Sequence, residues 1–143
     1  MRRRSGKNWI VIESADHTPA EPFGDLVVSK FATHDLLNSM TSLDELQNRK
    51  PKLSQNVRLE QTFRQTDEGW TRESLSLRQH KGFHGVMGLE PIVADFLGRC
   101  DGERTLGEVV TSFAQKVDAP LEQVRKECLQ ATRLLIERGF VVV

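Results

Sequence analysis

The chain has 143 residues, a length that allows one domain, or one small domain with an appended segment, and excludes two full domains. Its 38% hydrophobic and 28% charged residues are typical of a globular domain and exclude an intrinsically disordered chain. Because 20 Lys and Arg stand against 20 Asp and Glu, the formal net charge is +0, and the broad positive surface of a dedicated nucleic-acid binder is missing.

The cysteines and the amino terminus indicate a cellular compartment. Cys100 and Cys128 form no Cys-x-x-Cys motif, so the sequence indicates neither a disulfide framework nor a structural zinc site. No apolar run approaches the roughly 18 residues of a membrane span. The apolar segment at residues 9–12 is too short for a signal peptide. We therefore expect a reduced, cytoplasmic protein.

Residues 1–55 are predicted to form a strand followed by a helical connecting segment. Residues 8–13 are rich in Trp, Ile and Val, which favours a short strand. After a loop with two prolines, apolar residues at helical spacing predict a helix from about residue 25 to residue 38. Ser42 and Glu45 have the spacing of a capping box, which predicts a second, short helix that ends at the next proline.

The middle of the chain changes its hydrophobic period. From Val57 to Leu77 apolar and polar residues alternate, which predicts a β-hairpin. Its turn is predicted at residues 67–69, where glycine accepts a positive φ without steric cost. The segment from His80 to Gly88 holds three glycines and is predicted to be a mobile loop or a bulged strand.

Three short helices are predicted after Glu90. Pro91 suits the first turn of the first helix, and Thr105 with Glu108 forms a capping box that opens the second. The third helix ends at Gly139, and the last four residues predict a terminal strand. The predicted inner faces of the three helices are, in turn, Ile92, Val93, Phe96 and Leu97; Leu106, Val109, Val110 and Phe113; Leu121, Val124, Cys128, Ala131 and Leu135.

These elements together predict an α+β fold. Residues 56–143 are expected to form a winged-helix-like domain, in which a β-hairpin and a short carboxy-terminal strand flank a three-helix core, and residues 1–55 are expected to precede it as a strand and helical segment. The alternative is a plain three-helix bundle with a disordered amino-terminal half. Capped helix boundaries and the change of period favour the first.

No catalytic, cofactor-binding or metal-binding residue is predicted. His80 and His84 are spaced like two metal ligands on a helix, but Gly82 and Gly85 oppose a helix there and no third ligand accompanies them. The same glycines lack the spacing and the strand-to-helix context of a dinucleotide-binding loop. The two cysteines lie on or next to apolar helix faces, where they are expected to be core residues without a lowered pKa.

The winged-helix outline suggests a DNA-binding hypothesis, in which the third helix enters the major groove. Its predicted outward residues are Glu122, Gln123, Lys126, Glu127, Gln130, Arg133 and Glu137. Acidic side chains outnumber basic ones here and repel phosphate, so nucleic acid is not an expected partner.

Two parts of the carboxy-terminal half resemble a known family. Residues 96–110 (FLGRCDGERTLGEVV) and 134–141 (LLIERGFV) resemble the peptide-chaperone family of pyrroloquinoline quinone biosynthesis. The resemblance implies a small winged-helix module that binds a precursor peptide along a strand and the third helix. The predicted groove then consists of Glu73, Leu75 and Leu77, on a strand whose edge pairs with the peptide, and Glu122, Lys126 and Arg133 on the helix.

A second resemblance covers nearly the whole chain. It is carried by residues 2–6 (RRRSG), 8–9 (NW), 31–32 (FA), 52–61 (KLSQNVRLEQ), 69–70 (GW), 77–79 (LRQ) and 100–102 (CDG). These residues are similar to the carboxy-terminal region of a bacterial class I S-adenosylmethionine-dependent methyltransferase family. The resemblance implies that a Rossmann-like catalytic domain, which binds S-adenosylmethionine, lies upstream in a longer polypeptide.

The 143 residues hold no glycine-rich cofactor loop, no acidic ribose-binding residue and no Asn-Pro-Pro-type motif, so we expect this segment not to methylate anything by itself. We predict a non-catalytic accessory region of a methyltransferase, which positions substrate or packs against the catalytic domain. The alternatives are a stand-alone peptide-binding module and a transcription regulator. The expected partners are the upstream domain and a peptide or protein substrate, without a membrane.

Overall fold

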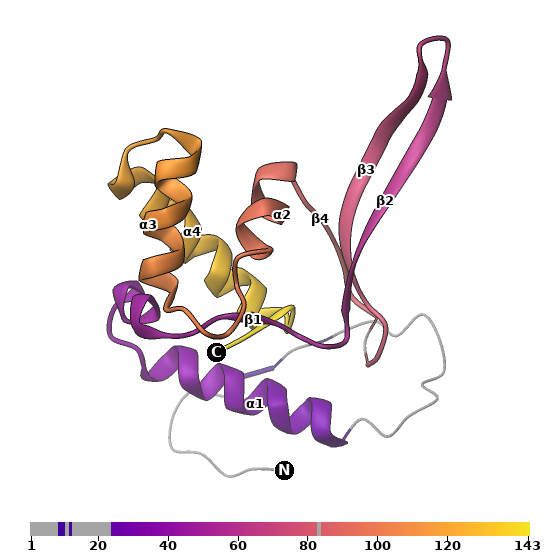
Figure 1. The fold of residues 1–143 in the computed structure, drawn as a ribbon. Coiled ribbons are helices and arrows are strands. Elements are labelled where there is room, and N and C mark those ends of the chain that lie inside the picture. Colours follow the sequence, from indigo (N-terminus) through magenta and orange to yellow (C-terminus); the bar gives the residue numbers. More distant parts are fainter. Residues whose placement is uncertain (1–8, 11, 13–23, 83) are drawn as a thin grey trace.

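The computed structural model describes residues 9, 10, 12, 24–82 and 84–143. The elements in chain order are α1 (Gly24–Ser39), the 3₁₀ helix η1 (Leu43–Asn48), β1 (Lys52–Leu53), β2 (Val57–Thr66), β3 (Gly69–Gln79), β4 (Val86–Gly88), α2 (Pro91–Leu97), α3 (Leu106–Val117), α4 (Leu121–Glu137) and β5 (Val141–Val142). One antiparallel sheet pairs β1 with β5, and the other has the order β2-β3-β4. The predicted α+β class is confirmed (Figure 1).

The core lies among α2, α3 and α4. The Thr105–Glu108 capping box begins α3 as predicted, because the Glu108 carboxylate accepts from the Thr105 backbone N–H at 2.7 Å and the Thr105 hydroxyl accepts from the Glu108 N–H. All four predicted inner residues of α3 are buried, and the Phe113 ring packs edge-on against Phe96, with centroids 5.5 Å apart. The amphipathic pattern of α3 therefore identified a true core face.

Two predicted core positions are wrong. Ile92 and Leu121 are 49% and 37% exposed. Both belong to the first turn of a helix, Ile92 in α2 and Leu121 in α4. The helical period assigns them to the inner face, but in these first turns both side chains remain exposed to solvent.

The β2–β3 hairpin is confirmed, and only its base belongs to the core. Leu75 and Leu77 of β3 are buried, whereas Leu59, the partner of Leu77 in the register, is 50% exposed. A β-bulge between Thr62 and Phe63 shifts the register. Beyond it the hairpin projects past the helices (Figure 1).

Short strands complete the two sheets. Part of the glycine-rich segment forms β4, which pairs with β3 from Arg78 opposite Val86 to Ser76 opposite Gly88. Of the two structures predicted for this segment, a loop or a bulged strand, these three residues form a strand. β1 was not predicted, because two residues are too few to show a period. It pairs with β5, the predicted terminal strand.

The amino-terminal part contains the predicted helix, α1. Ser42 and Glu45 form the predicted capping box, and the short helix that follows is the 3₁₀ helix η1. Leu37 is the buried residue of α1, which packs beside α4 (Figure 1). Of the strand predicted at residues 8–13, the described residues Trp9, Ile10 and Ile12 lie in no strand, and the others lie outside the described residues.

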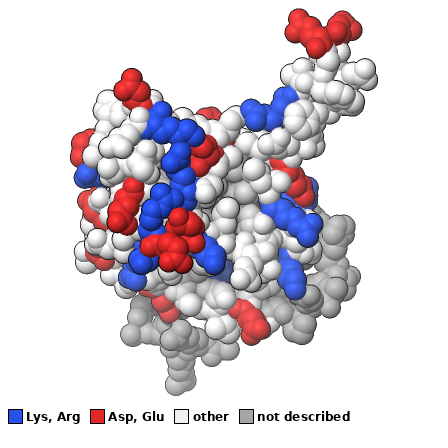
Figure 2. All heavy atoms as spheres, viewed as in Figure 1, with Lys and Arg blue, Asp and Glu red and all other residues white. Residues whose placement is uncertain are grey.

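Within the described part of the chain, no helix has both the length and the apolar character that a membrane crossing requires. On the face drawn in Figure 2, Lys and Arg are interspersed with Asp and Glu over the helical body, and acidic side chains occupy the tip of the hairpin. Charged side chains of both signs are therefore mixed over the helical body on this face.

Candidate functional site

A cleft of about 710 Å³ lies between α1, the end of the β2-β3-β4 sheet and the carboxy-terminal part of α4. Its volume is in the range of pockets that hold small molecules or a few side chains of a peptide. The cleft unites segments that are distant in the sequence, since Lys30, Val86 and Leu134 all line it. It is the candidate functional site.

The cleft has apolar surface that solvent can reach. Leu37 and Phe140 line it and are buried, whereas Leu134 and Val86 are 43% and 48% exposed. Leu134 stands beside the buried residues Leu135 and Ile136. Three consecutive apolar residues of a helix cannot all face one core, and this is the sequence signal from which an additional apolar surface on α4 could have been found.

Basic side chains predominate among the charged residues of the cleft. Lys30, Arg133 and Arg138 stand against one carboxylate, Glu137. Arg133 Nε donates to Glu137 Oε1 at 2.9 Å, and this pair neutralises one positive charge. Among the described residues that line the cleft, basic side chains therefore outnumber acidic ones.

Trp9 and α1 form an aromatic wall. The Trp9 ring lies 4.2 Å from the His34 ring and meets Phe31 edge-on, with centroids 5.5 Å apart. Asn38 Nδ2 lies 3.0 Å from His34 Nε2 and 3.1 Å from His34 Nδ1. These contacts hold Trp9 at the cleft, although its sequence position is far from the strands and from α4.

Gln79 joins the sheet to the end of α4 at the floor of the cleft. Its Nε2 donates to the carbonyl of Arg138 at 3.0 Å. A Cβ at Gly85 would lie 2.9 Å from Gln79 Oε1, so this position accepts only glycine without movement of the amide. The glycine-rich segment, predicted to have no cofactor role, therefore shapes the cleft by allowing this close approach.

The residues predicted for the peptide groove do not form one site. Arg133 lines the cleft, but the other five do not. Leu75 and Leu77 are buried core residues, and Leu77 is opposite Met87 of β4. The predicted pairing of a peptide with this strand edge is wrong at these positions, because β4 already occupies the edge.

The other three charged residues of that predicted groove lie elsewhere on the surface. Glu73 is exposed on the outer half of the hairpin, at the bulge. Lys126 and Glu122 are exposed toward the beginning of α4, and Glu122 pairs with Arg125 at 3.2 Å. The candidate cleft lies further along the same helix, where Arg133 lines it.

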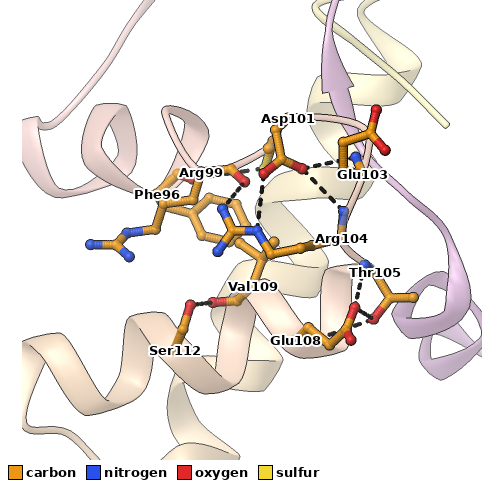
Figure 3. Close-up of polar contacts among 10 residues, drawn as sticks. Phe96, Arg99, Asp101, Glu103, Arg104, Thr105, Glu108, Val109 and Ser112 are labelled. Carbon is orange, nitrogen blue, oxygen red and sulfur yellow. Dashed lines mark hydrogen bonds and ion pairs between the residues drawn. The ribbon is translucent and has the colours of Figure 1, made fainter.

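A second polar cluster, in the turn between α2 and α3, has a structural role (Figure 3). Asp101 Oδ1 accepts from the backbone N–H groups of Glu103 and Arg104 at 2.8 and 3.1 Å, and Oδ2 accepts from Arg104 Nε at 3.0 Å. These bonds, first the one from the Arg104 backbone, lower the pKa of Asp101 to about 2. Arg104 also donates to the carbonyl of Arg99, so the cluster holds the turn closed.

The cysteines are core residues, as predicted. Cys100 and Cys128 are both free and buried. Burial raises the pKa of the Cys100 thiol to about 12 and that of the Cys128 thiol to about 11. The thiolate form, which is the nucleophile, is therefore disfavoured at neutral pH for both residues.

In the part of the chain that the structure describes, no three His, Cys, Asp or Glu residues are placed to hold a metal ion together. His80 Nε2 lies 3.8 Å from Glu60 Oε1 at the base of the hairpin. His84 lies in the β3–β4 connection and is exposed.

Comparison with protein families gives one match. Residues 30–143 match the model described as Domain of unknown function (DUF7782). Of the described residues that line the cleft, all but Trp9 lie within the match. No curated protein matches the chain.

Proposed function

The chain belongs to the DUF7782 family, whose description assigns no activity, and we propose that it is a non-catalytic accessory region of an S-adenosylmethionine-dependent methyltransferase. In this role it positions a substrate or packs against the catalytic domain. The cofactor binds to the upstream domain of the same polypeptide.

The cleft is the observation that carries the proposal. It combines exposed apolar side chains, such as Leu134, with a guanidinium and with amide groups, which is the composition of a surface that binds rather than of one that reacts. The Asp101 carboxylate already accepts hydrogen bonds from neighbouring residues of the turn, and the two thiols are buried. The methyltransferase assignment is supported by the sequence resemblance over nearly the whole chain.

The same proposal places the protein in the cytoplasm. Two free, buried cysteines suit a reducing compartment.

The mass of the native polypeptide tests the assignment. Peptides from this segment identify the protein in its source cells, and its mass is compared with the 16.2 kDa of these 143 residues. A much larger species that contains a Rossmann-like sequence is expected. A native species of 16.2 kDa would overturn the accessory role.

Substrate positioning is tested in that larger polypeptide. Leu134→Ser removes exposed apolar surface from the cleft, and we expect a higher KM for the methyl acceptor with kcat unchanged. Leu59→Ser is the matched control, because Leu59 has a similar exposed fraction and lies on the hairpin outside the cleft lining. Equal KM values for the two variants would contradict positioning by the cleft.

One observation favours the stand-alone peptide-binding module as a second candidate. β4 is one of the two edge strands of its sheet, and Val86 of β4 also lines the cleft. The Gly85 carbonyl and the Leu89 N–H face β3, where they bond to Gln79 and Leu75. Because hydrogen-bonding direction alternates along a strand, the backbone groups of Val86 point to the free side and can pair with an extended peptide.

Val86→Pro distinguishes this candidate. The substitution removes an outward N–H without removing a bond to β3, so the fold is retained and peptide affinity falls. Peptides encoded near this protein are the ligands to titrate, and isothermal titration calorimetry measures the affinity. Unchanged affinity would refute pairing along β4.

A transcription regulator is not proposed. Glu122, Glu127 and Glu137 are exposed on α4, and carboxylates on a recognition helix repel phosphate.

A further inference from the structure

We infer that the cleft takes a ligand in which an anionic oxygen group, such as a carboxylate, is joined to an apolar body, and that Arg138 binds the anionic group. The inference rests on the proposed binding role of the cleft and adds the chemical class of what it binds.

The charged side chains of the cleft indicate an anionic ligand. Two guanidinium groups line the cleft, and one of them, that of Arg133, pairs with Glu137 at 2.9 Å. The Arg138 guanidinium forms no ion pair or side-chain hydrogen bond with any residue that the structure describes. A ligand carboxylate can therefore reach it without displacing an existing partner, and a guanidinium binds a carboxylate through two parallel hydrogen bonds.

The backbone of Arg138 is held in place. Its N–H donates to the carbonyl of Leu134 at 3.0 Å, and its own carbonyl accepts from Gln79 Nε2 at 3.0 Å. Gly139 follows with φ +78, where the chain leaves the helix. The root of the side chain is thus fixed to both α4 and β3, which reduces the entropy that binding would cost.

The apolar part of the ligand has a surface beside this cation. Leu134 precedes Arg138 by four residues, so the two side chains are neighbours on one face of α4. Leu134 and Val86 expose close to half of their surface to the cleft and to solvent. A wholly polar anion would leave these side chains unused, and a wholly apolar ligand would leave the guanidinium desolvated without a partner.

Two ligand sources share this chemistry, namely a free organic acid and an acidic residue next to an apolar one in a polypeptide. The probes are octanoate and octyltrimethylammonium, which have the same tail and opposite charge. Two peptides of equal length, acetylated at the amino terminus and amidated at the carboxy terminus, in which Leu alternates with Glu or with Lys, complete the set.

Trp9 reports where the probes bind. The chain has two tryptophans, and Trp70 is 72% exposed on the hairpin, so Trp70→Phe leaves Trp9 as the sole tryptophan, within the cleft. Calorimetry gives the affinity and Trp9 fluorescence gives the location. We expect octanoate or the Glu peptide to bind with a change in Trp9 emission, and the cationic probes to bind at least about tenfold more weakly.

Arg138→Gln is the decisive variant. We expect it to weaken binding of the anionic probe about tenfold. Arg125→Gln is the matched control, because Arg125 lies on the same helix, outside the cleft lining, and we expect no change in affinity. Stronger binding of the Glu peptide than of octanoate assigns the polypeptide source, and the reverse assigns a free acid.

Three results would overturn the inference: equal affinity for the anionic and cationic probes, equal effects of the two arginine variants, or no binding of any probe. Preferred binding of the Lys peptide would overturn the ligand class and leave the binding role intact. The native mass tests the methyltransferase role separately, so the two proposals fail by different measurements.

Discussion

The helical layer of α2, α3 and α4 and the outer half of the β2–β3 hairpin are both regular, but their side chains are in different environments. In α3, Val109 and Val110 are almost fully buried, because η1 and α4 cover that face. In the hairpin, Phe63 and Trp70 are 51% and 72% exposed, and the strands are held together by their own ladder. Regular backbone structure therefore does not guarantee burial, and most buried apolar side chains of the described residues belong to the helices.

The largest expected effect is that of a cavity in the helical layer. Leu135→Ala, at a side chain with 1% exposure, should lower the free energy of unfolding by about 2–5 kcal/mol. Leu59→Ala is the matched hairpin variant and should cost less than about 0.5 kcal/mol. Urea denaturation measures both, and similar losses for the two variants would remove the contrast between the regions.

A side chain at Gly102 should have the next largest effect. The residue has φ +84, and an added Cβ would lie 3.1 Å from Lys52 Cδ, so Gly102→Ala should cost about 1–2 kcal/mol. Gly88→Ala in β4 is the control, because a Cβ there meets nothing within 4 Å. If thermal denaturation gave both variants the same midpoint, the turn between α2 and α3 would be less constrained than the structure indicates.

The capping box sharpens the comparison at the level of one hydrogen bond. Thr105→Ala removes the acceptor of the Glu108 N–H at the start of α3 and should cost about 1 kcal/mol. Thr105→Ser keeps the hydroxyl and should retain most of the stability. Chemical denaturation of the wild type and the two variants measures the free energy of unfolding. Equal losses for the Ala and Ser variants would show that the threonine methyl group, and not the capping hydrogen bond, stabilises the protein.

The smallest expected effect is confined to acidic pH. The folded pKa of Asp101 is lowered to about 2 from the usual 3.8, so its stabilising contribution is complete above about pH 4 and is lost as pH falls toward 2. Asp101→Asn cannot ionise. The stability difference between wild type and this variant should therefore shrink between pH 4 and pH 2. A constant difference between their urea midpoints over that range would contradict the stabilising role of the Asp101 charge.

The accuracy of sequence prediction also differs between features. The capping boxes and the hairpin turn depend on residues within a few positions of one another, and all were predicted. The free strand edge at Leu77 was predicted wrongly, because β4 has three residues and too little pattern to reveal that it covers that edge. Of the six residues predicted for the groove, only Arg133 lines the cleft.

The sequence by itself determined the order of the helices, the hairpin and the α+β class, because periodicity, caps and turns are local properties. The tertiary structure alone decided where the cleft lies, because Lys30, Val86 and Leu134 come together only when α1 packs beside α4 and β4 joins β3. It also decided which apolar residues stay exposed. That outcome depends on whether another element covers them, and the pattern of a single amphipathic segment does not show which elements pack against it.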